Sequence, residues 1–233
     1  MLAVAPSAKI SYKLPKSTTL GEPAILAVTL SNTTGYRITA DFGVDDQTAF
    51  IYRHLRPDGT LEKVEPSLTP ANRMRTSRLM LRGNSRTASV VLDEWLDLSQ
   101  MGRHQIDVEY RGAVDLEGGN AASVSRLTQL WIDVKPRDVA RLEKRAGDWL
   151  KVVSRLTQGS EARAASVALT SMKDPVAIPY LQMAATRTRT AIYFDALAAM
   201  NKPEARAVLE ELARNPDREI KALAVRALTR AGG

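Results

Sequence analysis

The stretch LTQLWIDVKPRDVARLEKRAGDWL, residues 127–150, decides how this chain is divided. Its first eight residues alternate along a two-residue period, which is typical of a β-strand with one buried face. After Pro136 the apolar residues recur every three or four positions, as in an amphipathic helix, and Asp138 is well placed to cap that helix. The sequence therefore predicts a β domain over residues 1–135 and a helical domain over residues 136–233.

Short alternating segments with Pro, Gly and Asn turn signals recur throughout the first 135 residues. No helical period occurs among them, so the pattern favours an antiparallel β-sandwich of two packed sheets. We read Asn32-Thr33-Thr34 as a turn between two strands, rather than as a glycosylation acceptor. The segments predict eight or so strands, at residues 8–14, 25–30, 36–42, 49–54, 78–81, 88–92, 104–110 and 127–134.

One part of the β region indicates a particular type of β-sandwich. In LDEWLDLSQMGRHQIDVEYRG, residues 92–112, Trp95 and Leu98 lie on a short crossing before an alternating strand. This resembles the penultimate connection of immunoglobulin-like extracellular domains, and residues 20–43 resemble their early strand pair. The resemblance implies an immunoglobulin-like β-sandwich. The chain departs from it in two ways: no cysteine pair can join the sheets, and His104 stands where a tyrosine is usual.

The helical region contains an internal repeat. DPVAIPYLQMAA (residues 174–185) aligns with KPEARAVLEELA (residues 202–213) at an offset of 28, so that Leu181 falls on Leu209. The pattern resembles the short HEAT-like repeat that phycobilisome lyases also contain, and it implies an α-helical solenoid of about three helical hairpins. Asp174 is expected to cap the first helix of one unit, and Asn201 to replace it in the next.

The repeat also defines candidate partner-binding residues. Arg187 and Arg189 fall in a turn between two helices, and Arg218 and Lys221 lie near the equivalent turn of the next unit. If the units stack in parallel, these side chains line one basic ridge. Phe194 and Val225 occupy equivalent positions and form either the core between repeats or an apolar patch for a partner. The candidate residues are thus Arg187, Arg189, Arg218, Lys221, Phe194 and Val225.

The net charge of the 233-residue chain is +7, and residues 136–233, with 17 basic and 11 acidic groups, carry +6 of it. Such an excess either keeps the surface solvated or attracts an acidic protein partner. Nucleic acid is the least favoured partner, because no stacking aromatic residues cluster with the basic ones. No apolar stretch is long enough to span a membrane.

The sequence offers little for catalysis. Its two histidines, His54 and His104, lie far apart, and we expect both on the surfaces of strands. There is no cysteine, and none of the common nucleophile, zinc or nucleotide motifs occurs. The prediction is therefore a protein that is not an enzyme, with no catalytic residues, no cofactor and no metal site.

These observations favour a noncatalytic protein–protein interaction module or scaffold. The combination of domains resembles exported bacterial proteins, which implies a periplasmic or extracellular setting and a leader that this chain lacks; a cytoplasmic origin stays open. Two alternatives remain. One is a β-sandwich like those of bacterial proteinase inhibitors, with residues 53–58 as the contact. The other is a lyase-like or nucleic-acid-acting HEAT-repeat enzyme.

Overall fold

The computed structural model describes residues 7–42, 49–65, 77–117, 123–124, 127–155 and 159–231. The chain forms two compact units. One comprises Met1–Thr18 and Ala24–Lys135, and the other Thr19–Pro23 and Pro136–Gly233. The short segment Thr19–Pro23 thus groups with the helices, although strands flank it in sequence.

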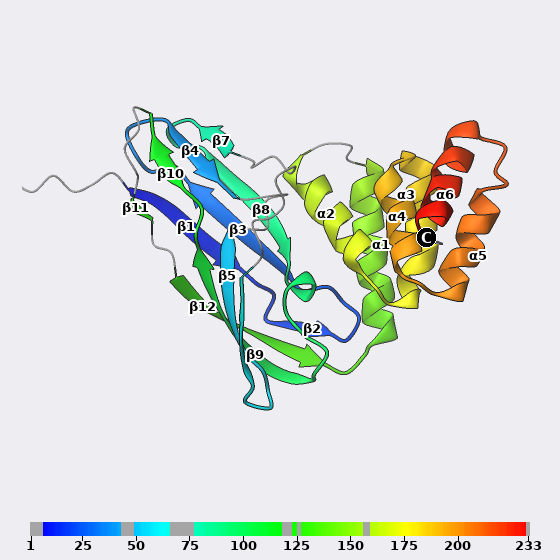
Figure 1. Ribbon diagram of the computed structural model, residues 1–233, viewed down its shortest axis with the longest axis horizontal. Coiled ribbons are helices and arrows are strands. Elements are labelled where there is room, and N and C mark those ends of the chain that lie inside the picture. Colours follow the sequence, from blue (N-terminus) through cyan, green and yellow to red (C-terminus); the bar gives the residue numbers. More distant parts are fainter. Residues whose placement is uncertain are drawn as a thin grey trace, which may run out of the picture. The chain divides into compact units, whose positions relative to one another are not determined.

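The first unit is built of strands, twelve of them in the described part of the chain (Figure 1). All eight segments predicted from alternation contain a strand, whereas β2, β6, β10 and β11 were not predicted. Each of these four is short, at two to four residues. The strands are β1 (Ser7–Lys13), β2 (Ser17–Thr19), β3 (Ile25–Ser31), β4 (Ile38–Asp41), β5 (Phe50–Leu55), β6 (Leu61–Val64), β7 (Ser77–Met80), β8 (Ser85–Val91), β9 (Gly102–Tyr110), β10 (Val114–Leu116), β11 (Ser123–Val124) and β12 (Leu127–Lys135).

The strands of the described residues form three hydrogen-bonded sheets, in the orders β11-β1-β3-β8, β10-β4-β7 and β2-β12-β9-β5-β6. The pairs β1–β3, β3–β8, β4–β7, β4–β10, β5–β6, β5–β9 and β9–β12 are antiparallel, and β1–β11 is parallel. The five-stranded sheet contains the longest ladder, in which Leu127 pairs with Glu109 at one end and Val134 with Gly102 at the other. A β-rich region with antiparallel sheets therefore precedes the helices, as the sequence predicts.

Alternate residues of the strands fill the core of this unit. On β3, Leu26, Val28 and Leu30 are fully buried, while their neighbours in sequence are partly exposed. The ring of Tyr110 on β9 contacts that of Phe42, which follows β4 in another sheet, at a centroid distance of 6.1 Å. Because residues of different sheets share this apolar interior, the arrangement is sandwich-like. Burying each such side chain contributes about 1.5–3 kcal/mol.

The predicted turn after β3 is confirmed. Asn32 is buried, and its side-chain amide donates to the backbone oxygens of Tyr36 and Met80 at 2.8 and 3.1 Å. Its Oδ1 accepts from the backbone N–H and the hydroxyl of Thr34 at 3.0 and 2.7 Å. An asparagine with both ends bonded inside the protein holds the turn together and offers no site for a sugar.

The described residues of the second unit form six α-helices, labelled in Figure 1. Neighbours in sequence pair as α1 with α2, α3 with α4, and α5 with α6. In addition, α1 contacts α3, which contacts α5, and α2 contacts α4, which contacts α6. The helices are α1 (Val139–Arg155), α2 (Ser160–Ser171), α3 (Ile178–Thr188), α4 (Ala191–Ala199), α5 (Pro203–Leu212) and α6 (Arg218–Ala231), with a short 3₁₀ turn, η3 (Pro175–Ala177), before α3.

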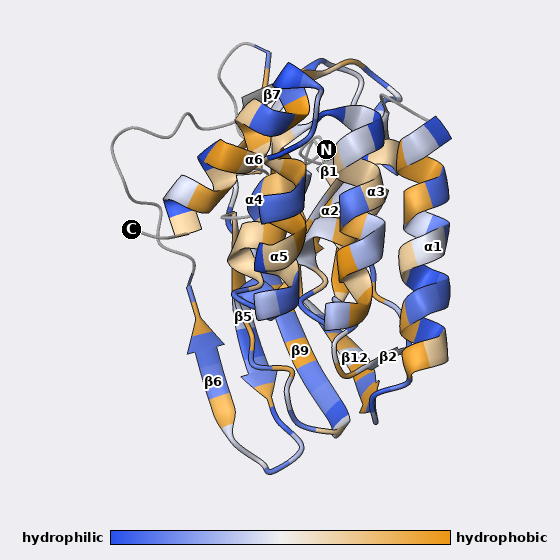
Figure 2. Cartoon of the chain, turned by 90° about the vertical axis from the view of Figure 1, so that its right-hand side faces the viewer, coloured by the Kyte–Doolittle hydropathy of each residue, from blue (hydrophilic) through white to orange (hydrophobic). Residues whose placement is uncertain are grey.

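The predicted helical pattern agrees with the burial. Asp138 caps α1, because its Oδ1 accepts from the backbone N–H of Arg141 at 3.0 Å. Hydrophilic and hydrophobic residues alternate along α1 in Figure 2, as expected for a helix that buries one face. The repeat is visible in the burial as well, since Leu181 on α3 and Leu209 on α5, which align at the offset of 28, are both almost wholly inaccessible.

The two predicted caps of the repeat differ. Asp174 accepts from the backbone N–H of Val176 at 3.0 Å, as expected, and also binds the guanidinium of Arg137 through both carboxylate oxygens, at 2.6 and 2.9 Å. The expectation for Asn201 is wrong. This residue adopts a left-handed conformation (φ 49°) just after α4, and Lys202 at the start of α5 makes no side-chain capping bond.

Candidate functional site

The four predicted basic residues lie at two turns of the helical unit. Arg187 is in the last turn of α3, and Arg189 follows it in a left-handed conformation (φ 52°). Arg218 and Lys221 lie in the first turn of α6. All four side chains are exposed.

Arg189 connects these two turns. Its guanidinium lies 2.9 Å from the carboxylate of Asp217 and 3.7 Å from that of Glu219. Because Asp217 immediately precedes α6, the turn after α3 and the turn before α6 are neighbours, as the ridge hypothesis requires. In these contacts the carboxylates of Asp217 and Glu219 neutralise the positive charge of Arg189. Arg189 is thus a structural ion-pair partner within an acidic environment, and it contributes little to a basic surface.

Arg187, in contrast, borders a pocket of about 810 Å³ between α1, α2, α3 and α4. Its Nη1 donates a long hydrogen bond of 3.4 Å to the hydroxyl of Ser154, and no carboxylate among the described residues pairs with it. The pocket is lined by Val153, Ser154, Gly159, Ala162, Arg163, Ser166, Val167, Arg187, Thr188, Thr190, Ile192 and Tyr193.

The chemistry of this lining is one-sided. Its described residues include the guanidinium groups of Arg163 and Arg187 and several hydroxyl groups, and no carboxylate is among them. The hydroxyls of Ser166 and Tyr193 lie 2.9 Å apart, and burial raises the pKa of Tyr193 above its ordinary value, so the phenol keeps its proton. Ile192 stays 45% exposed and adds an apolar edge. The pocket therefore suits an anionic group attached to an apolar one.

The two apolar candidates have different environments. Phe194 on α4 is fully buried, so the core interpretation is correct and the residue is not available as a surface contact. Val225 on α6, at the equivalent position, is 45% exposed. The difference arises because Phe194 lies in the middle hairpin, packed among neighbouring helices, whereas α6 belongs to the last one.

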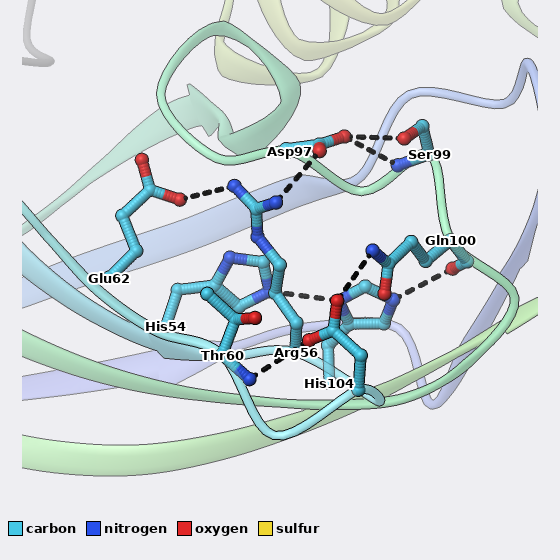
Figure 3. A network of polar contacts seen from close by, with 9 residues as sticks. His54, Arg56, Thr60, Glu62, Asp97, Ser99, Gln100 and His104 are labelled. Atoms are coloured by element: carbon cyan, nitrogen blue, oxygen red, sulfur yellow. Dashed lines mark hydrogen bonds and ion pairs between the residues drawn. The ribbon is translucent and has the colours of Figure 1, made fainter.

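A second cluster lies in the β unit and corrects the sequence-based expectation for the histidines. His54 on β5 and His104 on β9 are both fully buried, with their rings stacked at a centroid distance of 5.0 Å (Figure 3). His54 Nε2 lies 2.8 Å from His104 Nδ1, and His104 Nε2 lies 2.8 Å from the backbone oxygen of Gln100.

These contacts indicate which ring nitrogens of the two histidines carry a proton. Since the Gln100 oxygen can only accept, His104 Nε2 must donate to it, which makes Nδ1 of a neutral His104 an acceptor. His54 Nε2 then donates to that acceptor, and His54 Nδ1 is left as a buried acceptor with no hydrogen-bond partner in the described structure. Burial, the neighbouring His104 and the charge of Arg56 together lower the pKa of His54 to about 4.

Charged side chains surround the pair. The guanidinium of Arg56 lies 2.7 Å from the carboxylate of Glu62 and 3.2 Å from that of Asp97 (Figure 3). Asp58, in the turn before β6, accepts from the side chain of Gln100 at 2.9 Å. The loop that the inhibitor alternative requires, residues 53–58, is thus tied to the rest of the sheet. With no exposed imidazole, this cluster is suited to holding strands together rather than to acting on a substrate.

The sequence contained part of the signal for this cluster. His54 alternates in step with the buried Phe50 and Tyr52, and His104 with Ile106, so each belongs to the buried face of its strand. The pairing of β5 with β9 makes the two histidines diagonal neighbours, and alternation alone does not reveal which strands pair.

No group of three or more His, Cys, Asp or Glu side chains among the described residues could hold a metal ion. None of the described helices combines the length and the apolar character that crossing a membrane requires.

Neither a protein-family model nor a curated protein matches the chain. Among solved structures, a CARDB domain from Pyrococcus furiosus, crystallised with di-metal ions, is 11% identical over 56% of this chain and 90% of its own, with a TM-score of 0.33. A β-glucosidase from Listeria innocua is 12% identical over 56% of this chain and 16% of its own, with a TM-score of 0.32. The ApaA protein from Bordetella pertussis is 8% identical over 55% of this chain and 92% of its own, with a TM-score of 0.30. These similarities assign neither a family nor an activity to the chain.

Proposed function

We propose that this protein is a noncatalytic binding protein whose helical unit takes up an acidic segment of a partner protein. The observation that carries the proposal is the pocket between α1 and α4, whose lining includes Arg163 and Arg187 and no carboxylate. A glutamate or aspartate of the partner would accept from the Arg187 guanidinium, and an adjacent apolar side chain would contact Ile192.

The energetics favour this type of ligand. A hydrogen bond to a charged group contributes about 1.5–3 kcal/mol, about twice that of a neutral pair. Among the described residues the Arg187 guanidinium donates only to the hydroxyl of Ser154, through a long bond of 3.4 Å, so little is lost when a carboxylate replaces it. Arg218 and Lys221 lie outside this lining and would act at longer range, by attracting a negatively charged partner.

We further propose that the six helices are three stacked HEAT-like hairpins, and that the β unit is immunoglobulin-like. The alternating contacts α1–α3–α5 and α2–α4–α6 and the repeat offset of 28 support the first part. The crossing and strand around residues 92–112 support the second. A periplasmic or extracellular location rests on the resemblance to exported proteins, and fractionation of cells that make the full open reading frame tests it.

Peptide binding tests the function. Fluorescein-labelled decapeptides that contain Asp or Glu beside Leu or Val, and matched peptides with Asn or Gln, are titrated with the protein and followed by fluorescence polarisation. We expect binding of acidic peptides only, and a loss of at least about tenfold in Arg187→Gln. Arg226→Gln, which removes an exposed arginine of α6 outside the pocket, is the matched control.

Equal binding of acidic and amide peptides, or an Arg187→Gln variant that binds as tightly as the wild type, would contradict the proposal. An equal loss in the Arg226→Gln control would show that general positive charge, rather than the pocket, attracts the peptide. In that case the site proposed here is wrong.

A further inference from the structure

The outward face of the five-stranded sheet presents an exposed tryptophan beside a cluster of amide and carboxylate groups. Trp131 on β12 is 44% exposed and pairs across the ladder with Gln105 on β9. Two residues along, Gln129 pairs with Asp107. Because residues two apart on a strand face the same side, these four side chains share one face of the sheet, on which pairs along a strand lie about 7 Å apart.

The polar groups of this face are linked and only partly used. The side-chain amides of Gln129 and Gln105 both donate to Oδ1 of Asp107, at 3.2 and 3.4 Å. Both contacts are long. Within the described residues, the amide oxygens of the two glutamines and Oδ2 of Asp107 accept no hydrogen bond. The two amides and the carboxylate therefore hold one another in position. Their remaining oxygens can still accept hydrogen bonds from a ligand.

Trp131 is held in place without being covered. The guanidinium of Arg103 lies over its ring at 5.0 Å from the centroid, and the side chain still exposes 44% of its surface. Such a stack restricts the indole at little entropic cost, and a rigid aromatic surface is effective for binding.

The charges of this face are balanced. On β12, β9 and β5 the outward residues include the basic residues Arg53, Arg103 and Lys135 and the acids Asp107, Glu109 and Asp133. Arg53 lies 3.3 Å from Glu109, and Arg103 lies 3.9 Å from Asp133. With both arginines paired and three basic residues set against three acids, the face has no surplus of positive charge to attract a nucleic acid or a sulfated glycan.

We propose that this face binds a neutral polysaccharide. The C–H face of a pyranose ring would stack on the exposed indole of Trp131. Vicinal hydroxyl groups, each both donor and acceptor, would bond to the amides of Gln105 and Gln129 and to the carboxylate of Asp107. A sugar ring has an apolar C–H face and polar hydroxyl groups, and this sheet face offers an aromatic surface for the first and hydrogen-bonding groups for the second. A purely apolar or a purely ionic partner would use only one of the two.

Native gel electrophoresis with a polysaccharide cast into the gel tests the proposal. The probes are laminarin, barley β-glucan, xylan and glycogen, with heparin as the anionic comparison. We expect the wild-type protein to be retarded by at least one neutral polysaccharide. Trp131→Ala should weaken that affinity at least about tenfold, and Trp131→Phe, which keeps an aromatic face, should retain most of it. Leu79→Ala, which removes an exposed apolar side chain (63%) from another sheet, should have no effect.

Three outcomes would overturn the proposal: no retardation by any neutral polysaccharide, retardation by heparin alone, or unchanged retardation of Trp131→Ala. If Trp131→Phe binds the polysaccharide as weakly as Trp131→Ala, the proposal is also contradicted, because an aromatic ring at this position would then not be enough for binding. Circular dichroism of each variant establishes that the β unit remains folded. The peptide assay of the helical pocket is independent of every one of these results.

Discussion

His54 Nε2 lies 2.8 Å from His104 Nδ1, and neither ring is exposed to solvent. The hydrogen bond requires that at least one of the two rings be neutral, because two doubly protonated rings would bring two donors together with no acceptor between them. In the unfolded chain His54 regains an ordinary pKa near 6.5, whereas in the fold its pKa is lowered to about 4. The pair therefore links the stability of the β unit to pH.

The first prediction is a loss of stability on mild acidification. Between pH 6.5 and pH 4 the unfolded state binds a proton that the folded state does not, so stability is complete above this window and falls as the pH is lowered through it. From pH 7 to pH 5 the loss is about 2 kcal/mol. Urea unfolding at pH 7, 6 and 5 measures it. The His54→Gln variant keeps a donor toward His104 and does not titrate, so its free energy of unfolding should fall less between pH 7 and pH 5. An equal fall in the wild type and the variant would show that His54 is not the group responsible.

The neighbouring acids do not obscure this window. Asp58 has its pKa lowered to about 2, chiefly by the hydrogen bond from Gln100, and the hydroxyl of Ser99 lowers the pKa of Asp97. A group with a lowered folded pKa loses its stabilising effect only as the pH falls below its unfolded value, near 4 for a carboxylate. Their losses therefore come at more acidic pH than that of His54.

The second prediction concerns a close approach at the end of β9. The hydroxyl of Tyr110 donates to the backbone oxygen of Asp41 at 2.6 Å, and a Cβ added at Gly112 would overlap both atoms. Gly112→Ala should therefore destabilise the β unit by about 3 kcal/mol, because either the hydrogen bond or the backbone must move. Gly35→Ala, whose Cβ would meet nothing within 4 Å, should change stability by less than about 0.5 kcal/mol. Similar melting curves for the two variants would refute the argument.

Local sequence rules account for much of the fold. Alternation identified every strand of four or more residues except β6, because a strand with one buried face repeats every two positions. The cap at Asp138 and the repeat that aligns Leu181 with Leu209 were likewise visible. Of the missed strands, β2, β10 and β11 have two or three residues, which is too short for a period to appear, and β6 has no buried residue to mark one face. Asn201 was misjudged because two local roles compete for it, namely closing one helix in a left-handed conformation and capping the next.

The sites depend on contacts that sequence spacing does not contain. The pair His54–His104 needs the order of strands in the sheet, and the ion pair Arg189–Asp217 needs two turns of different hairpins to meet. The ridge hypothesis placed the basic residues correctly at those turns, yet it could not foresee that acids would oppose Arg189 and that no acid in the described part of the chain would oppose Arg187. Charge balance is a property of neighbours in space, so it appears only once the helices are packed.

The third prediction contrasts two equivalent positions of the repeat. Phe194 is fully buried and Val225 is 45% exposed, although they align at an offset of 31. Phe194→Ala should cost about 3–5 kcal/mol through lost burial and the cavity left behind. Val225→Ala should cost less than about 0.5 kcal/mol. Thermal unfolding followed by circular dichroism at 222 nm measures both, and a large effect at Val225 would show that α6 packs against more than the described contacts.

The last prediction tests how Thr19–Pro23 is held to the helices. The carboxylate of Glu22 is nearly inaccessible and accepts from Arg141 Nε at 2.7 Å and Arg145 Nε at 3.0 Å. Glu22→Gln keeps the shape but removes the charge. Because both arginines remain partly exposed to water, we expect a loss of about 2 kcal/mol rather than the 3–5 kcal/mol of a fully buried pair. The exposed Glu204 on α5, changed to Gln, is the matched control. Limited proteolysis should cut the Glu22→Gln variant faster within residues 19–23. If this segment stays equally protected in both variants, the paired arginines do not hold it.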